Sequence, residues 1–144
     1  MRRYYTASVY IKYNQKVLLH RNKRLGMIIP VGGQIEENEL PQDAAIREVK
    51  EETGLDVKIL NNEDKLLEFS DSNELIKPVH IMLEEVSVGH QCVDFIFYGI
   101  VDTNELFPQD GETKELMWLS ESEINEHKFI SEYVKYMAVN LLNY

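Results

Sequence analysis

Three glutamates, Glu48, Glu51 and Glu52, lie within little more than one helical turn of each other. At spacings of three and four residues their side chains share one face of a helix, where like charges repel by a few tenths of a kcal/mol per pair. Carboxylate oxygens are the hard ligands that Mg²⁺ and Mn²⁺ prefer, so a bound divalent cation would remove this repulsion. Acidic helix faces are also often simply solvated, and the charge cluster alone leaves both interpretations open.

The glutamates belong to a helix that the sequence predicts over residues 40–53. Its core side is marked by apolar residues at helical spacing, namely Leu40, Ala44, Ala45, Val49 and Leu55. Pro41 suits a first helical turn, and Gly54 suits the position that ends a helix. Gly32 and Gly33 precede the helix, and glycine lets a backbone approach a ligand closely because it carries no Cβ. An acidic patch beside such a loop is chemically suited to a metal and a phosphate group.

This spacing resembles the Nudix box. That pattern reads Gly, five residues, Glu, seven residues, Arg-Glu, an aliphatic residue, any residue, Glu-Glu, any residue, Gly and an aliphatic residue. Here it runs from Gly33 through Glu39 and Arg47 to Leu55, and every fixed position is filled. The resemblance implies hydrolysis of a nucleoside diphosphate linked to another moiety X. In that reaction water attacks one phosphorus of a P–O–P bridge while divalent ions neutralise the charge.

The resemblance also implies which residues bind the cation. Glu51 and Glu52 are expected to be the principal ligands of Mg²⁺, or of Mn²⁺, and the carbonyl group of Gly32 a further ligand. Glu48 is expected to be either a third ligand or the general base that takes a proton from water. The sequence does not decide between these two roles of Glu48.

Three further residues are assigned supporting roles by the same resemblance. Arg47 lies four residues before Glu51, and pairing with it would orient that ligand; an ordinary helix ion pair is the alternative. Glu39 is expected to be a weak ligand or a partner of Arg47. Family members commonly recruit another acid from a downstream loop, and we prefer Glu112 to Glu115 because its loop can swing over the metal. A plain surface acid is the alternative for Glu112.

Substrate contacts are expected from a basic cluster just before the glycines. Arg21, Lys23 and Arg24 stand out in an acidic protein, and arginine binds phosphate through two parallel hydrogen bonds. We expect them, with Gly33, to bind the phosphates, and a solvated hairpin edge is the alternative.

Asp94 is a carboxylate in an otherwise apolar strand and is a candidate for contacting the nucleobase. A solvent-facing or locally paired carboxylate is the alternative interpretation. Several aromatic residues are candidates for stacking on a base, although most of them should be core: Tyr5, Tyr10, Phe95 and Tyr98.

The elements that must position these residues are read from the period of the apolar pattern. A helix opened by the Ser120–Glu123 capping box and an amphipathic helix over residues 129–144 close the chain. Strands are expected at 4–13 and 17–21 (a hairpin), 27–36, 57–69 (one or two), 77–86, 92–101 and 115–120. The predicted fold is an α/β sandwich with a mixed sheet, a Nudix-type α/β/α arrangement in one domain spanning residues 1–144.

Composition excludes some partners. The net charge of −10 argues against a nucleic-acid duplex, which needs a positive stripe, but not against a small nucleotide bound through a metal. A single cysteine, Cys92, rules out an internal disulfide framework. No signal peptide or membrane-spanning stretch is visible, so a cytoplasmic location is expected. A homodimer is expected from analogy with the family alone.

The favoured function is hydrolysis of a nucleoside triphosphate to a monophosphate and pyrophosphate, because the predicted single domain carries no extra binding module. An ADP-ribose or nucleotide-sugar pyrophosphatase is the first alternative, although the signature residues of known subclasses beyond the box are absent. A non-catalytic nucleotide-sensing domain is the second, and such domains usually lose box glutamates. A protein that merely docks through an acidic helix would not need Gly33 and Gly54 at these spacings.

Overall fold

The fold is built on an eight-stranded sheet whose two long strands, β1 (Arg2–Tyr13) and β7 (His90–Ile100), run parallel and side by side. This computed structural model describes residues 1–23, 26–62, 65–109 and 115–144. The pairings of the other strands are antiparallel, so the sheet is mixed, as predicted. These strands are β2 (Lys16–Arg21), β3 (Ile28–Ile29), β4 (Val31–Gln34), β5 (Lys58–Ile59), β6 (His80–Ser87) and β8 (Glu115–Leu119).

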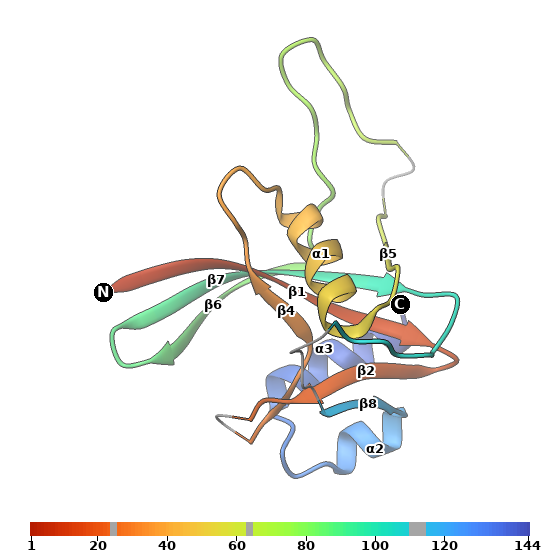
Figure 1. Cartoon of the computed structure of the whole chain (residues 1–144). Coiled ribbons are helices and arrows are strands. Elements are labelled where there is room, and N and C mark those ends of the chain that lie inside the picture. Colours follow the sequence, from red (N-terminus) through yellow and green to blue (C-terminus); the bar gives the residue numbers. More distant parts are fainter. Residues whose placement is uncertain (24–25, 63–64, 110–114) are drawn as a thin grey trace.

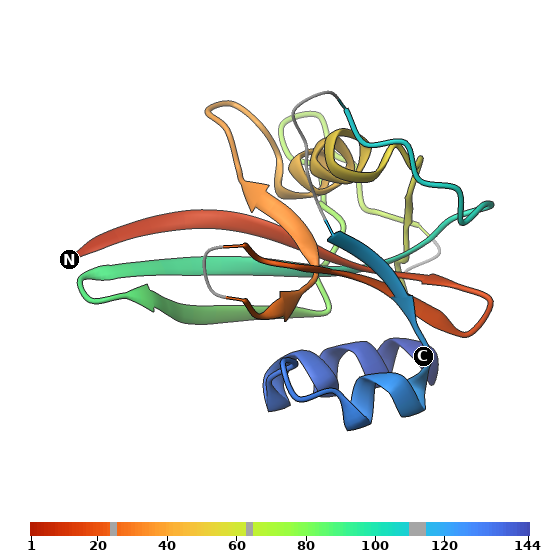
Figure 2. The ribbon, with the colours of Figure 1, turned by 60° about the horizontal axis from the view of Figure 1, so that its bottom comes forward.

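Helices cover both faces of this sheet (Figures 1 and 2). Helix α1 (Pro41–Thr53) lies over one face, and helices α2 (Glu121–Glu126) and α3 (Glu132–Leu142) lie against the other. The result is the α/β/α sandwich expected from the sequence. None of the described helices is both long and apolar enough to cross a lipid bilayer.

Two cores result because successive residues of a strand point to opposite faces. Val9 and Phe97 belong to the core under α1, whereas Tyr10 and Ile96 belong to the core under α2 and α3. This alternation places Asp94 on the same side of β7 as Ile96. The polar residues of β1 that precede Tyr10 at the same period therefore lie on the α3 side of the sheet.

Helix α1 begins and ends at the residues that local chemistry predicts. Pro41 is its first residue, and Gly54 ends it with a positive φ of 78° while its N–H donates to the carbonyl of Lys50 over 2.9 Å. A Cβ on Gly54 would lie 2.4 Å from the carbonyl oxygen of Phe107. Glycine is therefore required both for the positive φ and for the lack of a Cβ. Leu40, in contrast, is 42% exposed and does not join the apolar side of the helix.

Three predicted elements are shorter in the structure than in the sequence pattern. Between residues 57 and 79 the described strand structure is limited to β5 and an isolated bridge from Glu68 to Asn73, because "SDSN" favours a turn. Strand β6 begins at His80, just after Pro78, which cannot donate to a ladder. The last helix begins at Glu132 because the side chain of Ser131 accepts the N–H of Val134 and caps it.

Candidate active site

The glutamate cluster of α1 lies against the glycines of β4. The N–H of Gly32 donates to Oε2 of Glu52 over 2.9 Å, and the Glu52 side chain is buried, with only 4% of the residue exposed. A Cβ on Gly33 would lie 2.4 Å from Oε1 of Glu48, so a larger residue there would displace this carboxylate from its place beside the strand. Glu52 therefore does not lie on a simply solvated helix face.

Arg47 joins the remaining acids into one network. Its Nε and Nη2 donate to the two carboxylate oxygens of Glu39 over 2.8 and 3.1 Å, a bidentate pair. Its Nη1 donates to Glu48 over 3.0 Å and to Glu51 over 3.3 Å. Nη2 also donates to the carbonyl of Gln34 over 3.0 Å, which ties the helix to the end of β4. The pairing with Glu51 that the sequence suggests is present, but Glu39 is the shorter contact.

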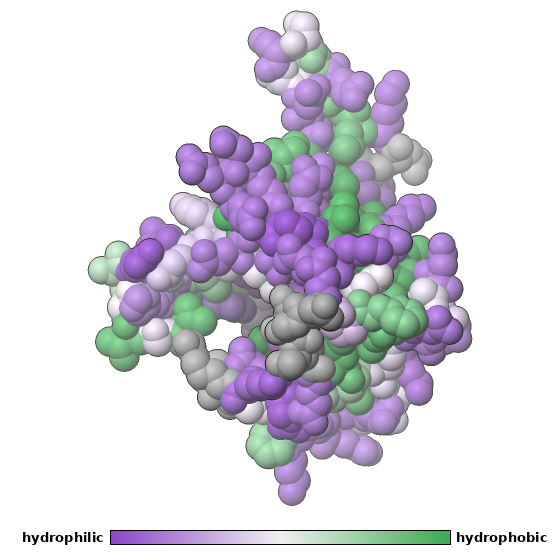
Figure 3. Space-filling view, viewed as in Figure 1, coloured by the Kyte–Doolittle hydropathy of each residue, from purple (hydrophilic) through white to green (hydrophobic). Residues whose placement is uncertain are grey.

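The charges of this network shift the pKa values of its members. Hydrogen bonds from Arg47 hold the pKa of Glu39 below its usual range, and the same contacts raise the pKa of Arg47. Both groups are therefore charged at neutral pH. One guanidinium faces the carboxylates of Glu39, Glu48 and Glu51, so negative charge remains on the cluster. Figure 3 shows hydrophilic side chains gathered on the surface around α1.

The donor set of this cluster fits Mg²⁺ or Mn²⁺. Glu48, Glu51 and Glu52 offer carboxylate oxygens and no sulfur or imidazole, which suits hard cations rather than zinc. Within the described ranges, no three or more acidic, histidine or cysteine side chains form a cage that could hold a metal ion. Mg²⁺ needs no such cage, because it commonly takes one or two protein carboxylates and fills its shell with water and phosphate oxygens.

Asp94 lines the same cavity as Glu52 of the glutamate cluster. A space of about 230 Å³ is lined by Gly32, Gly33 and Glu52 and also by Asp94. Further residues that line it are Thr6, Ser8, His20, Asn22, Ile29, Pro30, Glu84 and Cys92. The cavity thus joins the α1 side of the site, where the metal ligands are expected, to the α3 side of β7.

Asp94 is held by two hydroxyl groups of β1. Oγ1 of Thr6 donates to its Oδ1 over 2.9 Å, and Oγ of Ser8 lies 2.8 Å from Oδ2 and 3.0 Å from Oδ1. Burial raises the pKa of Asp94 to about 6, with a smaller contribution from the charge of Glu84, while the two hydroxyls lower it. The carboxylate is therefore locally paired, the alternative weighed from the sequence, and also reaches the cavity.

We expect Asp94→Asn to stabilise the protein at neutral pH. A raised pKa in the fold means that the contribution of Asp94 to stability is fully present below its unfolded pKa of about 4 and is lost as the pH rises through about 6. The asparagine variant should gain about 1–3 kcal/mol of unfolding free energy at pH 7.5, and much less at pH 4. Urea denaturation at both values measures this. A gain that is the same at both values, or a loss at pH 7.5, would contradict it.

The structure describes two residues of the basic cluster, Arg21 and Lys23. Arg21 forms an ion pair with Glu115 over 3.2 Å, donates to the carbonyl of Gly26 over 2.9 Å and lies 5.1 Å over the ring of Phe129. Lys23 is exposed on the surface. Arg24 lies outside the described residues, as does Glu112. Phosphate binding by Arg21, Lys23 and Arg24 stays a prediction, as does recruitment of Glu112; Glu115 is the partner of Arg21.

The sequence interpretation missed the residues that surround Asp94. Thr6 and Ser8 alternate along β1 with the buried Tyr10, so their hydroxyls lie on the same face of the sheet as its side chain. This alternation is the sequence feature from which their position could have been predicted. Glu84 approaches from β6, and no local pattern predicts which strand pairs with β7. Of the aromatic candidates, Tyr10 and Tyr98 are core residues, and Tyr5 is 56% exposed.

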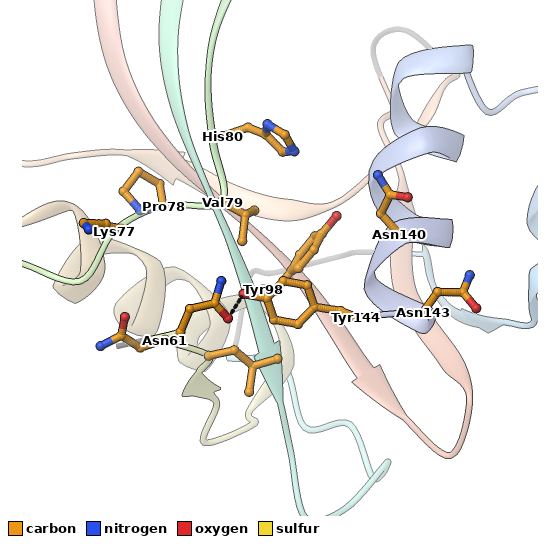
Figure 4. Close-up of a pocket in the computed structure, with 11 residues that line it drawn as sticks. Asn61, Lys77, Pro78, Val79, His80, Tyr98, Asn140, Asn143 and Tyr144 are labelled. Atoms are coloured by element: carbon orange, nitrogen blue, oxygen red, sulfur yellow. Dashed lines mark hydrogen bonds between the residues drawn. The ribbon is translucent and has the colours of Figure 1, made fainter. Parts of the chain in front are cut away.

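A separate cavity of about 470 Å³ lies beside the C-terminal helix (Figure 4). Tyr98 and Tyr144 meet there edge to face, and Asn140 of α3 and Asn143, which caps its end, lie opposite the segment from Lys77 to His80. The glutamates of α1 do not line this cavity, so it is no part of the acidic site.

The sandwich fold and the acidic helix against a glycine strand define a class of hydrolases that act on phosphate anhydrides with the help of metals. Within that class, the model of the NUDIX domain matches residues 2–138, and the chain belongs to the Nudix family. It is a Nudix pyrophosphohydrolase of the kind that acts on nucleoside diphosphate derivatives, and the family generally uses divalent metal ions.

Solved structures agree with this assignment. The chain is 38% identical to a Nudix-family hydrolase from Clostridium perfringens, with a TM-score of 0.89 over 99% of this chain and 98% of that one. It shares the fold of a MutT Nudix hydrolase from Burkholderia pseudomallei at 14% identity (TM-score 0.66, 99% and 98% covered). It also shares the fold of a UDP-X diphosphatase at 19% identity (TM-score 0.64, 99% of this chain and 62% of that one).

Proposed function

We propose that this protein hydrolyses nucleoside triphosphates to nucleoside monophosphates and pyrophosphate, with Mg²⁺ as its cofactor. The observation that carries the proposal is the cavity that Gly32, Gly33 and Glu52 line together with Asp94. An adjoining space of about 420 Å³ shares Ser8, Ile29, Pro30, Glu84 and Asp94 with it and reaches the side chains of Tyr10, Met27, Tyr133 and Val134. The part beside Gly32, Gly33 and Glu52 suits a metal-bound phosphate chain. The part beside Met27 and Tyr133 suits a flat, partly apolar base.

In this proposal the acidic cluster handles the phosphates. Glu51 and Glu52, together with the Gly32 carbonyl, would hold the cation, and Glu48 is either a third ligand or the general base. When bound, the cation supplies charge neutralisation at the phosphates and lowers the pKa of water. Water attacks one phosphorus of the α–β bridge, the bridging P–O bond breaks, pyrophosphate leaves and the proton of water passes to the base.

The chain holds these groups in place before substrate arrives. Arg47 fixes the carboxylates of Glu39, Glu48 and Glu51, and the N–H of Gly32 fixes that of Glu52. Such orientation limits the reorganisation needed during reaction, which is the main contribution a protein makes to this kind of chemistry.

The test is release of pyrophosphate and phosphate from a panel of nucleotides with Mg²⁺ and with EDTA. The panel contains NTPs and dNTPs, ADP-ribose, a UDP-sugar and a dinucleoside polyphosphate. The expected result is Mg²⁺-dependent formation of NMP and pyrophosphate from triphosphates, with slow turnover of the others. Faster turnover of ADP-ribose or the nucleotide sugar would overturn the triphosphate assignment, and binding without turnover would favour a nucleotide sensor.

A further inference from the structure

The cavity beyond the glycines has a mixed lining that fits one end of a nucleotide. Its walls include the apolar side chains of Met27, Ile29, Pro30 and Val134. Tyr133 of α3 lies among them, and Glu84 of β6 lines the same space. A planar, partly apolar group can pack between such walls, and its polar edge must then meet the groups at the floor of the cavity.

Asp94 has unused hydrogen-bond capacity at that floor. An ionised carboxylate has about four lone-pair sites, two on each oxygen. A hydroxyl has a single proton to donate, so Thr6 supplies Oδ1 and Ser8 supplies Oδ2, the nearer of its two contacts. Each oxygen of Asp94 therefore keeps one acceptor site. Two parallel acceptors of this kind match a ligand edge that carries two adjacent N–H groups.

The other charged side chains that line the cavity around Asp94 are carboxylates. Glu84 lines both parts of the cavity with Asp94, and Glu85 lines the part next to Tyr133. Among the described residues that line these two spaces, none is a lysine or an arginine. A base that presents carbonyl oxygens to this floor would face carboxylates, and its oxygens would repel them.

We infer that Asp94 accepts two hydrogen bonds from the nucleobase and thereby selects guanine-type bases, which present a ring N–H beside an exocyclic amino group. This inference rests on the proposed function, whose substrate class it narrows. Ser8 and Thr6 are positioning residues in this arrangement, because they orient the carboxylate without touching the base. Uracil and thymine lack the amino group, and hypoxanthine offers the ring N–H alone.

The test uses GMP and IMP, which differ only in the 2-amino group, together with UMP and CMP. Their dissociation constants are measured calorimetrically on the full chain without metal, so that the result does not depend on hydrolysis. We expect GMP to bind about tenfold to a hundredfold more tightly than IMP, because IMP leaves one carboxylate oxygen unpaired. Asp94→Asn should abolish most of this preference by weakening GMP binding. The matched control is Asp102→Asn, an exposed aspartate just beyond β7, which should leave both constants unchanged.

Each outcome of these measurements supports or overturns the role of Asp94. Equal binding of GMP and IMP, tighter binding of UMP or CMP, no binding of any of the four, or an unchanged preference in Asp94→Asn would overturn the inference. Turnover of all triphosphates at similar kcat/KM would do the same while leaving the proposed function intact. Selective GMP binding that Asp94→Asn removes, without turnover of any triphosphate, would overturn the proposed function and leave the role of Asp94 standing.

Discussion

Replacement of Glu52 by glutamine is expected to lower kcat by about three orders of magnitude, which corresponds to ~4 kcal/mol of lost transition-state stabilisation. Glu52 is the most deeply buried of the three helical glutamates, and its carboxylate lies at the Gly32 N–H, on the wall of the cavity. Glutamine keeps the shape of the side chain and an oxygen that accepts this N–H. The variant therefore removes the negative charge with little change in packing.

The control for Glu52→Gln is Glu126→Gln, the same change on the exposed side of α2. We expect the control to retain full activity and both variants to keep the thermal midpoint of the wild type within a few degrees. Mg²⁺ binding is measured separately by calorimetry and should weaken in Glu52→Gln alone. Activity within tenfold of the wild type, with unchanged Mg²⁺ affinity, would remove Glu52 from the metal site.

The parts of the site that are local in sequence were predictable, because local chemistry determines them. Pro41 and Gly54 set the ends of α1 through backbone geometry, and the spacing of Glu48, Glu51 and Glu52 follows from the helical period. The mixed sheet and its helical layers follow from the apolar pattern of the strands. The isolated bridge at Glu68 shows where this prediction fails. Apolar residues there suggest a strand, but the polar turn-forming residues that follow interrupt it.

The parts that depend on distant contacts were not predictable in this way. The partners of Asp94 on β1 are 86 and 88 residues away, and only the parallel pairing of β1 with β7 brings them together. The burial of Glu52 depends on where β4 lies beneath α1, which the helical period alone does not give. The bidentate contact of Arg47 with Glu39 likewise depends on the path of the chain before the helix.

Two buried carboxylates on the wall of the cavity are consistent with a binding site. A carboxylate removed from water costs free energy unless donors or cations compensate it, and Glu52 and Asp94 are each 4% exposed. The fold offsets part of this cost with the Gly32 N–H and two hydroxyls. Ligands that bring cations to Glu52 and N–H groups to Asp94 would offset the rest. Glu52 and Asp94 therefore lower the stability of the unliganded fold and are the same residues that are proposed to bind ligands.

Arg47→Lys is expected to lower kcat/KM by about 10- to 100-fold and to weaken Mg²⁺ binding by a similar factor. Lysine keeps the charge but has a single nitrogen at its tip. It cannot bind both oxygens of Glu39 while also donating to Glu48 and to the carbonyl of Gln34, as the guanidinium does. The carboxylates of Glu48 and Glu51 would then be less well oriented, although their charges are unchanged.

Mg²⁺ titration by calorimetry separates this positioning role from a merely structural one. Arg3→Lys is the matched control, since Arg3 is exposed and donates to the side chain of Gln91 on β7, and it should leave both quantities unchanged. Glu39→Gln removes the other half of the bidentate pair and should reproduce most of the loss. The double variant should then lose little more than either single variant, because both changes break the same contact. Additive losses, or a fall in thermal stability with normal Mg²⁺ affinity, would show that Arg47 supports the helix and does not orient the metal ligands.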